Sequence, residues 1–370
     1  AGVTSAHGLF DGQSALRTKQ IARSASDRSV VRWLIHPGET VELPFPKTIE
    51  QNDAGGFAPW RPVHRQPAYV YRFTNGLYHG AHGAVLDHRL RVFEDLADVV
   101  PNFFSDAAGI ASLRKKHQAR LSEGVAVALS SSQNYYHWLL KMLPRLHLVG
   151  EAGVDPNSCD ALFINKPTAA QAEGYLEAAL RPDLLRVIKG DEFWCCRQLY
   201  VASIAHDVPA WSVEYLRRLF LATNATEQTA STAIYLRRGN AATRRVRNED
   251  ELCNHLGRRG IRAFDLSQHS LREQIQIVSN ADLIIAPHGA ALANLVFAKK
   301  RTRVLEIFAN AENQKCYWMV ARHRRLIYHY VLAQPLPRGD ESNQFDMLVP
   351  LEKLNRALDY LERDSETFDL

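Results

Sequence analysis

The spacing of hydrophobic and polar positions changes along the chain at about residue 116. Before it, short alternating runs such as VVRWLIH, TVELPFP and AYVYRF, separated by Pro, Gly and Asn, predict a β-rich N-terminal region over residues 1–115. After it, the strand pattern VAVALS is followed by the helix pattern HWLLKMLPRLHLVGEAG, and strands and helices go on alternating to about residue 205. This alternation predicts a first Rossmann-like domain over residues 116–225.

A second series of the same kind follows the polar run TNATEQTAST. The strand patterns AIYLRR, IRAFDL, DLIIAPHG and TRVLEIF alternate with the helix patterns EDELCNHLGRRG and SLREQIQIVSNA, which predicts a second Rossmann-like domain over residues 226–335. The tail, residues 336–370, ends in an amphipathic helix with Pro350 near its first turn. The expected fold class is therefore α/β, with two Rossmann-like domains, a β-rich N-terminal region and a C-terminal helix.

The composition is that of an ordinary globular protein. Of 370 residues, 46% are hydrophobic and 23% are charged, and the net charge of +5 is too balanced for a dedicated nucleic-acid binder. Such a charge suits an anionic ligand in a local basic cleft. The five cysteines lack CxxC spacing, so we expect neither a disulfide framework nor a zinc knuckle. No run of the sequence indicates a membrane span or a signal peptide, and we expect a cytoplasmic protein.

The segment DLIIAPHGAALANLVF carries the clearest chemical signal. A strand pattern ends in Pro287, His288, Gly289 and Ala290 and passes directly into a helix pattern. Small residues there let a ligand approach the backbone, and the free N–H groups at a helix start attract anions. The segment therefore predicts a phosphate or diphosphate site, to which His288 and Asn294 add side-chain donors. A tight turn around a hydrogen-bonded histidine is the alternative.

Arginines cluster after the preceding strand pattern. Arg237 and Arg238 close AIYLRR, and three more follow in the next loop: Arg244, Arg245 and Arg247. The carboxyl ends of parallel strands share one edge, so we expect these arginines near the Pro287–Ala290 turn, where guanidinium groups would bind phosphate oxygens. A solvated basic loop is the alternative. Glu306, in TRVLEIF at the end of the next strand pattern, is a candidate acceptor for ribose hydroxyls, and a surface acid at a strand end is the alternative.

A second candidate site lies in SSQNYYHWLLKMLPRL. This stretch gathers aromatic and hydrogen-bonding side chains around one helix start: Asn134, Tyr135, Tyr136, His137, Trp138, Lys141 and Arg145. His137 and Lys141 are four residues apart and so share a helix face. Aromatic rings suit a sugar, and a histidine can act as general base near neutral pH. The same stretch equally fits a core-facing helix.

Several common catalytic motifs are absent from the sequence. It contains no GxGxxG, GxxxxGK[ST], GxSxG, HExxH or DxD. Nicotinamide, P-loop, hydrolase, zincin and metal-clamped nucleotide-sugar sites therefore lack their usual signatures. We expect an anion site that needs neither a metal nor a cofactor.

Together these motifs resemble the glycosyltransferase 61 family, which includes bacterial capsular polysaccharide biosynthesis proteins and eukaryotic xylosyl- and N-acetylglucosaminyltransferases. The resemblance covers about residues 125–335 and rests on four stretches in the family's order: NYYHWLLKMLPRL, YLRRGNAATRRVRNEDEL, LSQHSLREQIQIVSNADLIIAPHGAALANLVFA and TRVLEIF. It implies a GT-B-like arrangement of two Rossmann-like domains facing a cleft. The C-terminal domain would hold a nucleotide-sugar, and the sugar would be transferred with inversion.

The resemblance also implies roles for single residues. Seven match nucleotide-binding stretches of the family, namely Arg238, Arg245, Asn248, His288, Gly289, Asn294 and Glu306, while Arg237 stands where Ser is usual. Asn134 and His137 match the family's N-x-x-H, and Tyr136, Lys141 and Arg145 complete the expected acceptor side. Relatives usually carry Asp or Glu four residues after that histidine, the position expected for the catalytic base, and here it is Lys141. The candidate base is therefore His137 or a carboxylate that the sequence does not locate.

The sequence as a whole predicts an inverting glycosyltransferase. It would move a sugar from a nucleotide diphosphate donor, a UDP-sugar, to a glycan or glycolipid hydroxyl in capsule or lipopolysaccharide assembly, without a metal or a cofactor. The alternative, raised by Lys141, is a non-catalytic member that binds a nucleotide-sugar or a glycan and has lost its base. Nucleic acid is not an expected partner, and the expected location is the cytoplasm, with peripheral association at the inner face of the membrane.

Overall fold

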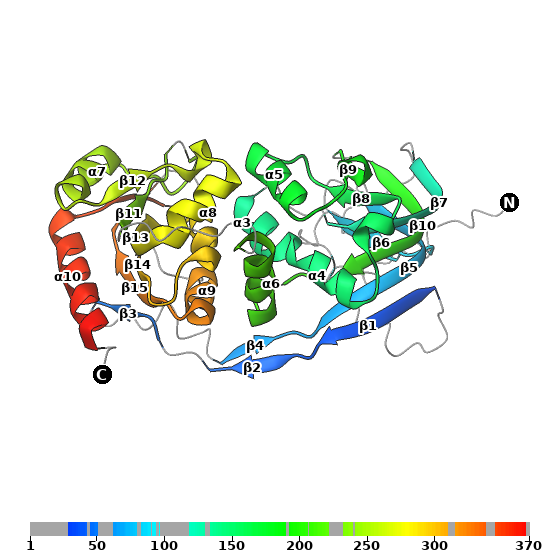
Figure 1. Cartoon of the computed structure of the whole chain (residues 1–370), viewed down its shortest axis with the longest axis horizontal. Coiled ribbons are helices and arrows are strands. Elements are labelled where there is room, and N and C mark those ends of the chain that lie inside the picture. The colour runs from blue at the N-terminus through cyan, green and yellow to red at the C-terminus, as the bar shows by residue number, and fades with distance from the viewer. Residues whose placement is uncertain are drawn as a thin grey trace. The chain divides into compact units, whose positions relative to one another are not determined.

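The computed structural model describes residues 29–42, 45–50, 62–79, 83–89, 91–93, 96, 118–129, 134–189, 192–205, 207–221, 232–239, 241–309, 315–337 and 345–367. The chain divides into two compact units (Figure 1). Unit 1 comprises Ala1–Glu39 and Gln66–His206, and unit 2 comprises Thr40–Arg65 and Asp207–Leu370. The boundaries expected near residues 115, 225 and 335 differ from this division, because segments on both sides of them share a sheet or a core.

Unit 1 is built on one mixed sheet with the strand order β1-β5-β10-β7-β8-β9, and β6 pairs with β5. The strands are β1 (Val30–His36), β5 (Ala68–His79), β6 (Ala84–Leu86), β7 (Gln118–Ala128), β8 (Ala161–Ile164), β9 (Leu185–Val187) and β10 (Phe193–Ala202). Strands β10, β7, β8 and β9 pair in parallel, whereas β1 and β5 join them in antiparallel pairs. Strands β1, β5 and β6, from the predicted N-terminal region, thus extend the α/β sheet of unit 1.

The core of unit 1 is aromatic. Phe73 of β5 packs edge-on against Phe93, with ring centroids 4.9 Å apart, and Tyr78 stacks on Phe163 of β8 at 5.4 Å. The connecting helices and single turns are α3 (Tyr135–His137), η6 (Trp138–Met142), α4 (Pro144–Glu151), η7 (Pro156–Ser158), α5 (Ala169–Glu177) and η8 (Pro182–Leu184). Helix α5 begins with a reciprocal capping box between Thr168 and Gln171.

Unit 2 is built on a parallel six-stranded sheet with the order β12-β11-β13-β14-β15-β3. The strands are β3 (Lys47–Thr48), β11 (Thr232–Leu236), β12 (Arg262–Phe264), β13 (Ala281–Pro287), β14 (Arg303–Phe308) and β15 (Ile327–Leu332). The helices are α6 (Ala210–Leu221), α7 (Glu249–Arg258), η9 (Leu266–Gln268), α8 (Leu271–Asn280), η10 (Ala290–Phe297), α9 (Cys316–Arg324) and α10 (Leu351–Thr367). Two ribbons complete the described strands: β2 (Glu39–Val41) with β4 (Val63–Arg65), and β16 (Gln334–Leu336) with β17 (Asp346–Leu348).

Helices cover both faces of the unit 2 sheet (Figure 1). Helices α7 and α10 bury Leu252, Leu256, Leu354 and Leu358 in one core with the inner residues of β11, β13, β14 and β15. Helices α8 and α9 lie on the other side, as Figure 1 shows. The predicted C-terminal helix is present, and it packs on this sheet rather than forming a separate tail.

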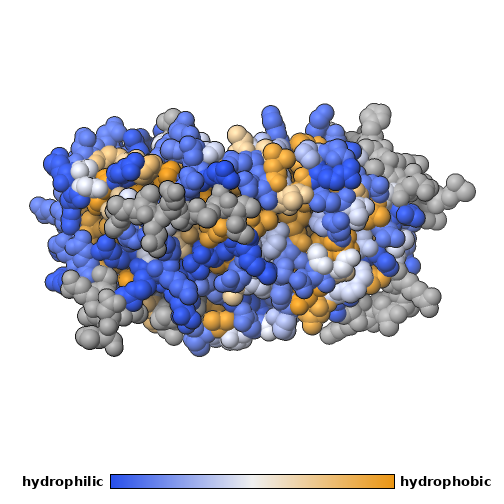
Figure 2. All heavy atoms as spheres, in the orientation of Figure 1, coloured by the Kyte–Doolittle hydropathy of each residue, from blue (hydrophilic) through white to orange (hydrophobic). Residues whose placement is uncertain are grey.

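The visible surface of α7 and α10 consists mainly of hydrophilic residues (Figure 2). In the part of the chain that the structure describes, no helix has both the length and the apolar run required to cross a bilayer. All five cysteines are free thiols, as expected from their spacing.

Candidate functional site

Two neighbouring parallel strands of unit 2 end at the same edge of the sheet. Strand β11 runs into Arg237 and Arg238, and β13 runs into His288 and Gly289. The Arg238 guanidinium connects the two strand ends, because Nη1 donates to the His288 carbonyl at 3.3 Å and Nη2 donates to the Thr243 carbonyl at 2.6 Å. The structure therefore brings together the arginine and the turn that the sequence predicts to share one site.

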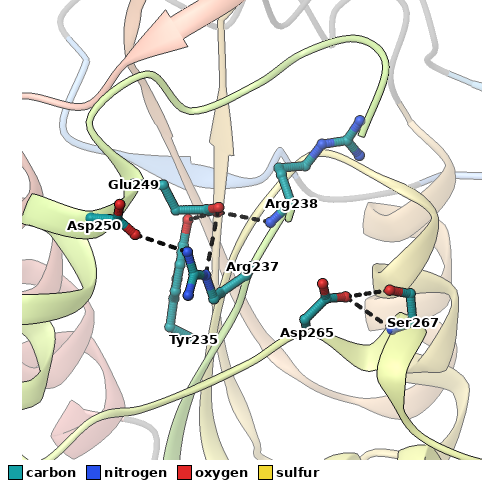
Figure 3. A network of polar contacts seen from close by, with 7 residues as sticks. All are labelled: Tyr235, Arg237, Arg238, Glu249, Asp250, Asp265 and Ser267. Atoms are coloured by element: carbon teal, nitrogen blue, oxygen red, sulfur yellow. Dashed lines mark hydrogen bonds and ion pairs between the residues drawn. The ribbon is translucent and has the colours of Figure 1, made fainter. Parts of the chain in front are cut away.

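Glu249 fixes the backbone of this arginine. Its Oε1 accepts a hydrogen bond from the Arg238 backbone N–H at 2.8 Å and another from the Tyr235 hydroxyl at 3.0 Å (Figure 3). Burial, and next the positive charge of Arg244, lower the pKa of Arg238, although a guanidinium stays protonated at neutral pH. The sheet edge thus carries a fixed and partly desolvated positive charge, and such a charge attracts an anion more strongly than a solvated one does.

The Arg237 side chain points toward Glu249 and Asp250, away from the Arg238 side chain (Figure 3). Successive extended residues alternate in direction, so Arg237 faces the acidic first turn of α7. Its Nη2 lies 3.0 Å from Asp250 Oδ1, and its Nε lies 3.6 Å from Glu249 Oε2. Arg237 therefore joins β11 to α7 and does not lie beside Arg238 at the turn, in contrast to the sequence expectation.

Two glycines give this edge its close packing. Gly289 precedes η10 with an extended backbone, and a Cβ atom at this position would overlap Nη1 of Arg238. Gly239 has φ 52° and lies against Asp265, which caps η9 through the Ser267 backbone N–H at 3.0 Å (Figure 3). Only glycine adopts the Gly239 conformation readily, and only glycine at 289 leaves the guanidinium in its observed place.

A buried carboxylate orients the His288 ring. Its Nδ1 lies 2.5 Å from Oε1 of Glu306, and the Tyr328 hydroxyl donates to the other oxygen, Oε2, at 2.6 Å. Burial first, and then the charge of Glu306, raise the pKa of Tyr328 well above its ordinary value, so the hydroxyl remains a donor. The imidazole also stacks on Phe308, with ring centroids 5.2 Å apart.

Glu306 is 0% exposed, and both of its oxygens are engaged by His288 and Tyr328. The expected contact with ribose hydroxyls does not fit this geometry, because no part of the carboxylate reaches the surface. Glu306 instead acts through His288, whose ring it orients. Pro287, the last residue of β13, and Ala290, the first of η10, hold the two ends of the same turn.

In the structure, the two asparagines expected in the nucleotide site form hydrogen bonds that hold neighbouring segments together. Asn294 is 0% exposed, and its amide donates to Gln274 at 3.2 Å and to the Ala291 carbonyl at 3.1 Å, which fixes η10 against α8. Asn248 accepts from the Val349 N–H and donates to the Val349 carbonyl, both at 3.0 Å. This pair fixes the start of α7 to the segment after β17.

The arginine-rich loop is held by Asp346 of β17, which is 2% exposed. One Asp346 oxygen accepts from the Arg245 backbone N–H at 2.9 Å, and the other lies 2.6 Å from Nη2 of Arg247. The exposed Arg245 side chain folds back on its own loop, where Nε donates to the Ala241 carbonyl at 2.8 Å. The sequence match assigns Arg245 to the nucleotide, but the structure shows it at the loop surface.

Two arginines that sequence reasoning did not single out hold the other end of η10. Nη1 of Arg217 donates to the Val296 carbonyl at 2.9 Å, and Nη2 of Arg324 donates to the Ala298 carbonyl at 2.9 Å. Burial lowers the pKa of Arg324 to about 10. They come from α6 and α9, far apart in sequence, so no local pattern could have paired them. Their contacts fix η10 and, through it, the turn beside Arg238.

The candidate site of unit 1 follows β7. Asn134 is an N-cap, since its side chain accepts from the Tyr136 N–H at 2.9 Å. The predicted helix is split into α3, a π-helical turn η6 and α4, because Pro144 cannot donate to Leu140 and its ring would collide with that carbonyl. Helical bonding therefore shifts by one residue, with the Leu143 N–H donating to the Trp138 carbonyl at 3.0 Å.

His137 and Lys141 remain half-buried beside this turn, and Tyr136 contacts both. The Lys141 ammonium lies 5.9 Å from the Tyr136 ring centroid, and the Tyr136 and His137 rings are nearly perpendicular at 5.2 Å. Arg145, by contrast, is 1% exposed and donates to the Leu96 carbonyl at 3.1 Å. The expected acceptor-side role of Arg145 does not fit such burial, whereas Tyr136, His137 and Lys141 stay accessible.

Within the described ranges, no cluster of three or more His, Cys, Asp and Glu residues has the arrangement of a metal site.

Comparison with known proteins gives one family. Residues 135–305 match the family model described as Glycosyltransferase 61. The chain is 34% identical over 93 residues to the EGF domain-specific O-linked N-acetylglucosamine transferase of Mus musculus, covering 24% of this chain and 17% of the relative. It is 30% identical over 124 residues to the enzyme of that name from Rattus norvegicus, covering 32% and 23%. The chain thus spans about a fifth of the length of these curated relatives. The matched range contains both the His137 segment and the Arg238–His288 contact, so residues 135–305, which include both candidate sites, are similar to the glycosyltransferase 61 family.

Proposed function

We propose that this chain is an inverting glycosyltransferase that uses a nucleoside diphosphate sugar, a UDP-sugar, as donor. The observation that carries the proposal is the Arg238 guanidinium, which connects the ends of β11 and β13 next to Gly289 and the start of η10. A guanidinium and the first N–H groups of a helix are both suited to phosphate oxygens. The family match over residues 135–305 supports the same assignment.

Arg238 would stabilise the leaving group. When the bond between the anomeric carbon and the diphosphate breaks, negative charge develops on the phosphate oxygens, and fixed donors lower the energy of that charge. Arg238 is held before the reaction by Glu249, Thr243 and His288, so little reorganisation is needed. A positive charge already at this edge is the reason to propose a metal-independent reaction that requires no cofactor.

His137 is the proposed general base. A neutral imidazole can take the proton of an acceptor hydroxyl as that oxygen attacks the anomeric carbon. His137 is half-buried beside Tyr136, whose ring offers a surface for a sugar. In this proposal unit 1 binds the acceptor and unit 2 binds the donor, in the GT-B-like arrangement implied by the family.

A binding-only protein is the second candidate function, and Lys141 is the observation that favours it. The family resemblance leads us to expect an acid at this position, and here a lysine stands there, with Nζ 5.9 Å from the centroid of the Tyr136 ring, a contact typical of a cation–π pair. Such a member would bind a nucleotide-sugar or a glycan without transferring the sugar.

The acceptor that we propose is a glycan or glycolipid hydroxyl in capsule or lipopolysaccharide assembly, at the cytoplasmic face of the membrane. The relatives named above transfer N-acetylglucosamine to EGF domains, as their names state, but they match over a small share of their length. UDP-N-acetylglucosamine is accordingly the first donor to test.

The experiment measures UDP release from a panel of UDP-sugars by the purified chain, with and without glycan acceptors, and in the presence of EDTA. We expect acceptor-dependent release that persists in EDTA. Binding of the UDP-sugar without release would favour the binding-only protein, and release that stops in EDTA would contradict metal independence.

A further inference from the structure

Five arginines lie between residues 237 and 247, and their contacts divide them into two groups. Arg237 and Arg247 are paired with carboxylates, and the exposed Arg245 side chain folds back on the Ala241 carbonyl. Arg238 and Arg244 are partly buried and have no carboxylate in ion-pair contact among the residues that the structure describes. The partly buried charges of this segment that lack a carboxylate partner therefore belong to two of its five arginines.

Arg238 and Arg244 are neighbours in space. Nη2 of Arg238 donates to the carbonyl of Thr243, the residue directly before Arg244, at 2.6 Å. The positive charge of Arg244 also lowers the pKa of Arg238, after the larger effect of burial. Two like charges at such a place repel each other unless an anion lies between them.

The backbone of Arg244 is held in an unfavourable conformation. Its φ is 56°, in the left-handed region that residues other than glycine rarely adopt. The next residue is fixed by Asp346, which accepts from the Arg245 N–H at 2.9 Å. The Nε atom of Arg244 is buried and has no hydrogen-bond acceptor among the described residues, and the same is true of Nε of Arg238. Strain and unsatisfied donors of this kind concentrate where a ligand binds.

We infer that Arg238 and Arg244 form a two-guanidinium clamp for a diphosphate, and that Arg244, not Arg245, is the second arginine of the site. This inference rests on the proposed function and deepens it. A diphosphate offers several charged acceptor oxygens, enough to engage both guanidinium groups and to offset their repulsion. The close contact of Gly289 with Arg238 places the start of η10 at the same anion.

The clamp has a stability signature that a structural arginine would not show. Removing the Arg244 charge relieves repulsion in the ligand-free protein, so Arg244→Gln should keep or raise the melting temperature while it weakens binding. Groups that serve a ligand commonly reduce stability in its absence. A purely structural arginine would lower the melting temperature when replaced.

The experiment is isothermal titration of the full chain with UDP, UMP and inorganic pyrophosphate, with melting temperatures measured in parallel. For Arg244→Gln we expect at least ~10-fold weaker binding of UDP and pyrophosphate, the scale of a lost charge-assisted hydrogen bond, and a change below about threefold for UMP. Arg244→Lys keeps the positive charge but lacks the planar guanidinium with its paired N–H donors, so its loss of affinity should be intermediate. Arg245→Gln should lose less affinity for UDP and pyrophosphate than Arg244→Gln does. Arg258→Gln, which replaces an exposed arginine of α7, is the matched control.

The outcomes separate the clamp from the proposed function. If Arg244→Gln binds UDP and pyrophosphate as the unmodified chain does, or if Arg245→Gln loses more, the clamp is wrong and the proposed donor site stands. If the unmodified chain binds pyrophosphate but no nucleoside diphosphate, and Arg244→Gln abolishes that binding, the clamp stands and the proposed function fails. An unmodified chain that binds none of the three probes overturns both.

Discussion

The two candidate sites differ in how their side chains are held. In unit 2, Arg238 is fixed by Glu249, Thr243 and His288, and His288 is fixed in turn by buried Glu306. In unit 1, His137 and Lys141 are half-buried beside a π-helical turn, where the Tyr136 ring contacts both of them. The first arrangement suits binding of a fixed charge, and the second suits groups that must meet varied acceptors. Mutations in the two sites should therefore separate binding from turnover.

The largest effect is expected for His137→Ala. Turnover should fall by about 100-fold or more, the usual scale for lost general-base assistance, while donor affinity changes little, because we propose that the donor binds unit 2. Transfer rates and UDP affinity, measured on the same preparation, test this separation. Normal turnover in the variant would remove His137 from the mechanism.

Lys141→Asp is the companion to this variant, because it introduces the acid that the family resemblance leads us to expect at this position. If the acid at this position is the true base, the variant should exceed the parent in turnover. If His137 is the base, Lys141→Asp should give no such gain. Turnover of the double variant His137→Ala/Lys141→Asp then shows whether the aspartate works without the histidine.

Arg238→Ala should have the next largest effect, on binding rather than on turnover of bound donor. A charge-assisted hydrogen bond contributes about 2 kcal/mol, so affinity for UDP should fall by about 30-fold. Arg237→Ala is the matched comparison, since its charge is already paired with Asp250, and its loss should stay below about threefold. Calorimetric titration with UDP measures the affinity of both variants. An equal loss of affinity would mean that Arg237 and Arg238 contribute alike to UDP binding.

The contrast between Arg237 and Arg238 shows how far the sequence could be interpreted. Parallel strand ends share one edge, so the meeting of Arg238 with the His288 turn followed from the strand patterns alone. Side-chain direction after the last strand residue is not visible in a pattern, and Arg237 turned to the acidic start of α7. Arg244 and Arg245 are adjacent in the same loop, and only the partners supplied by distant Asp346 and nearby Ala241 distinguish them.

Burial and non-local pairing limited the rest of the sequence interpretation. Glu306 in TRVLEIF could be interpreted as a strand-end acid at the surface, because its partner Tyr328 comes from a later strand. Strand β5 pairs with β10 across more than a hundred residues, β1 adds to β5, and β3 joins the unit 2 sheet at β15. The alternating strand and helix patterns predicted the α/β class well, because each pattern is local, whereas these pairings depend on the whole fold.

Glu306→Gln tests whether the buried carboxylate orients the His288 ring, and we expect a moderate effect on stability. With the Tyr328 hydroxyl still donating to its oxygen, the new amide must donate to Nδ1 of His288, so the imidazole proton moves to Nε2. Nitrogen chemical shifts of labelled His288 would report this change of tautomer. We also expect a loss of about 1–3 kcal/mol in the free energy of unfolding, since a hydrogen bond to a charged group is replaced.

Tyr328→Phe is the control for that variant, because it leaves Glu306 charged and in contact with Nδ1. Its tautomer should match that of the unmodified chain, and UDP affinity should follow the tautomer across the set. An unchanged tautomer in Glu306→Gln would mean that the carboxylate does not control the His288 ring.

Asn294→Ala should have the smallest effect on binding, and it sharpens the comparison because the family pattern and the structure disagree about it. The pattern assigns Asn294 to the nucleotide, whereas the structure buries it completely between Gln274 and the Ala291 carbonyl. Removing two neutral hydrogen bonds should lower the free energy of unfolding by about 1–2 kcal/mol and change UDP affinity by less than about threefold. Denaturant unfolding and UDP titration of the same variant measure both quantities. Loss of UDP affinity with unchanged stability would return Asn294 to the nucleotide site and would show that η10 rearranges when the ligand binds.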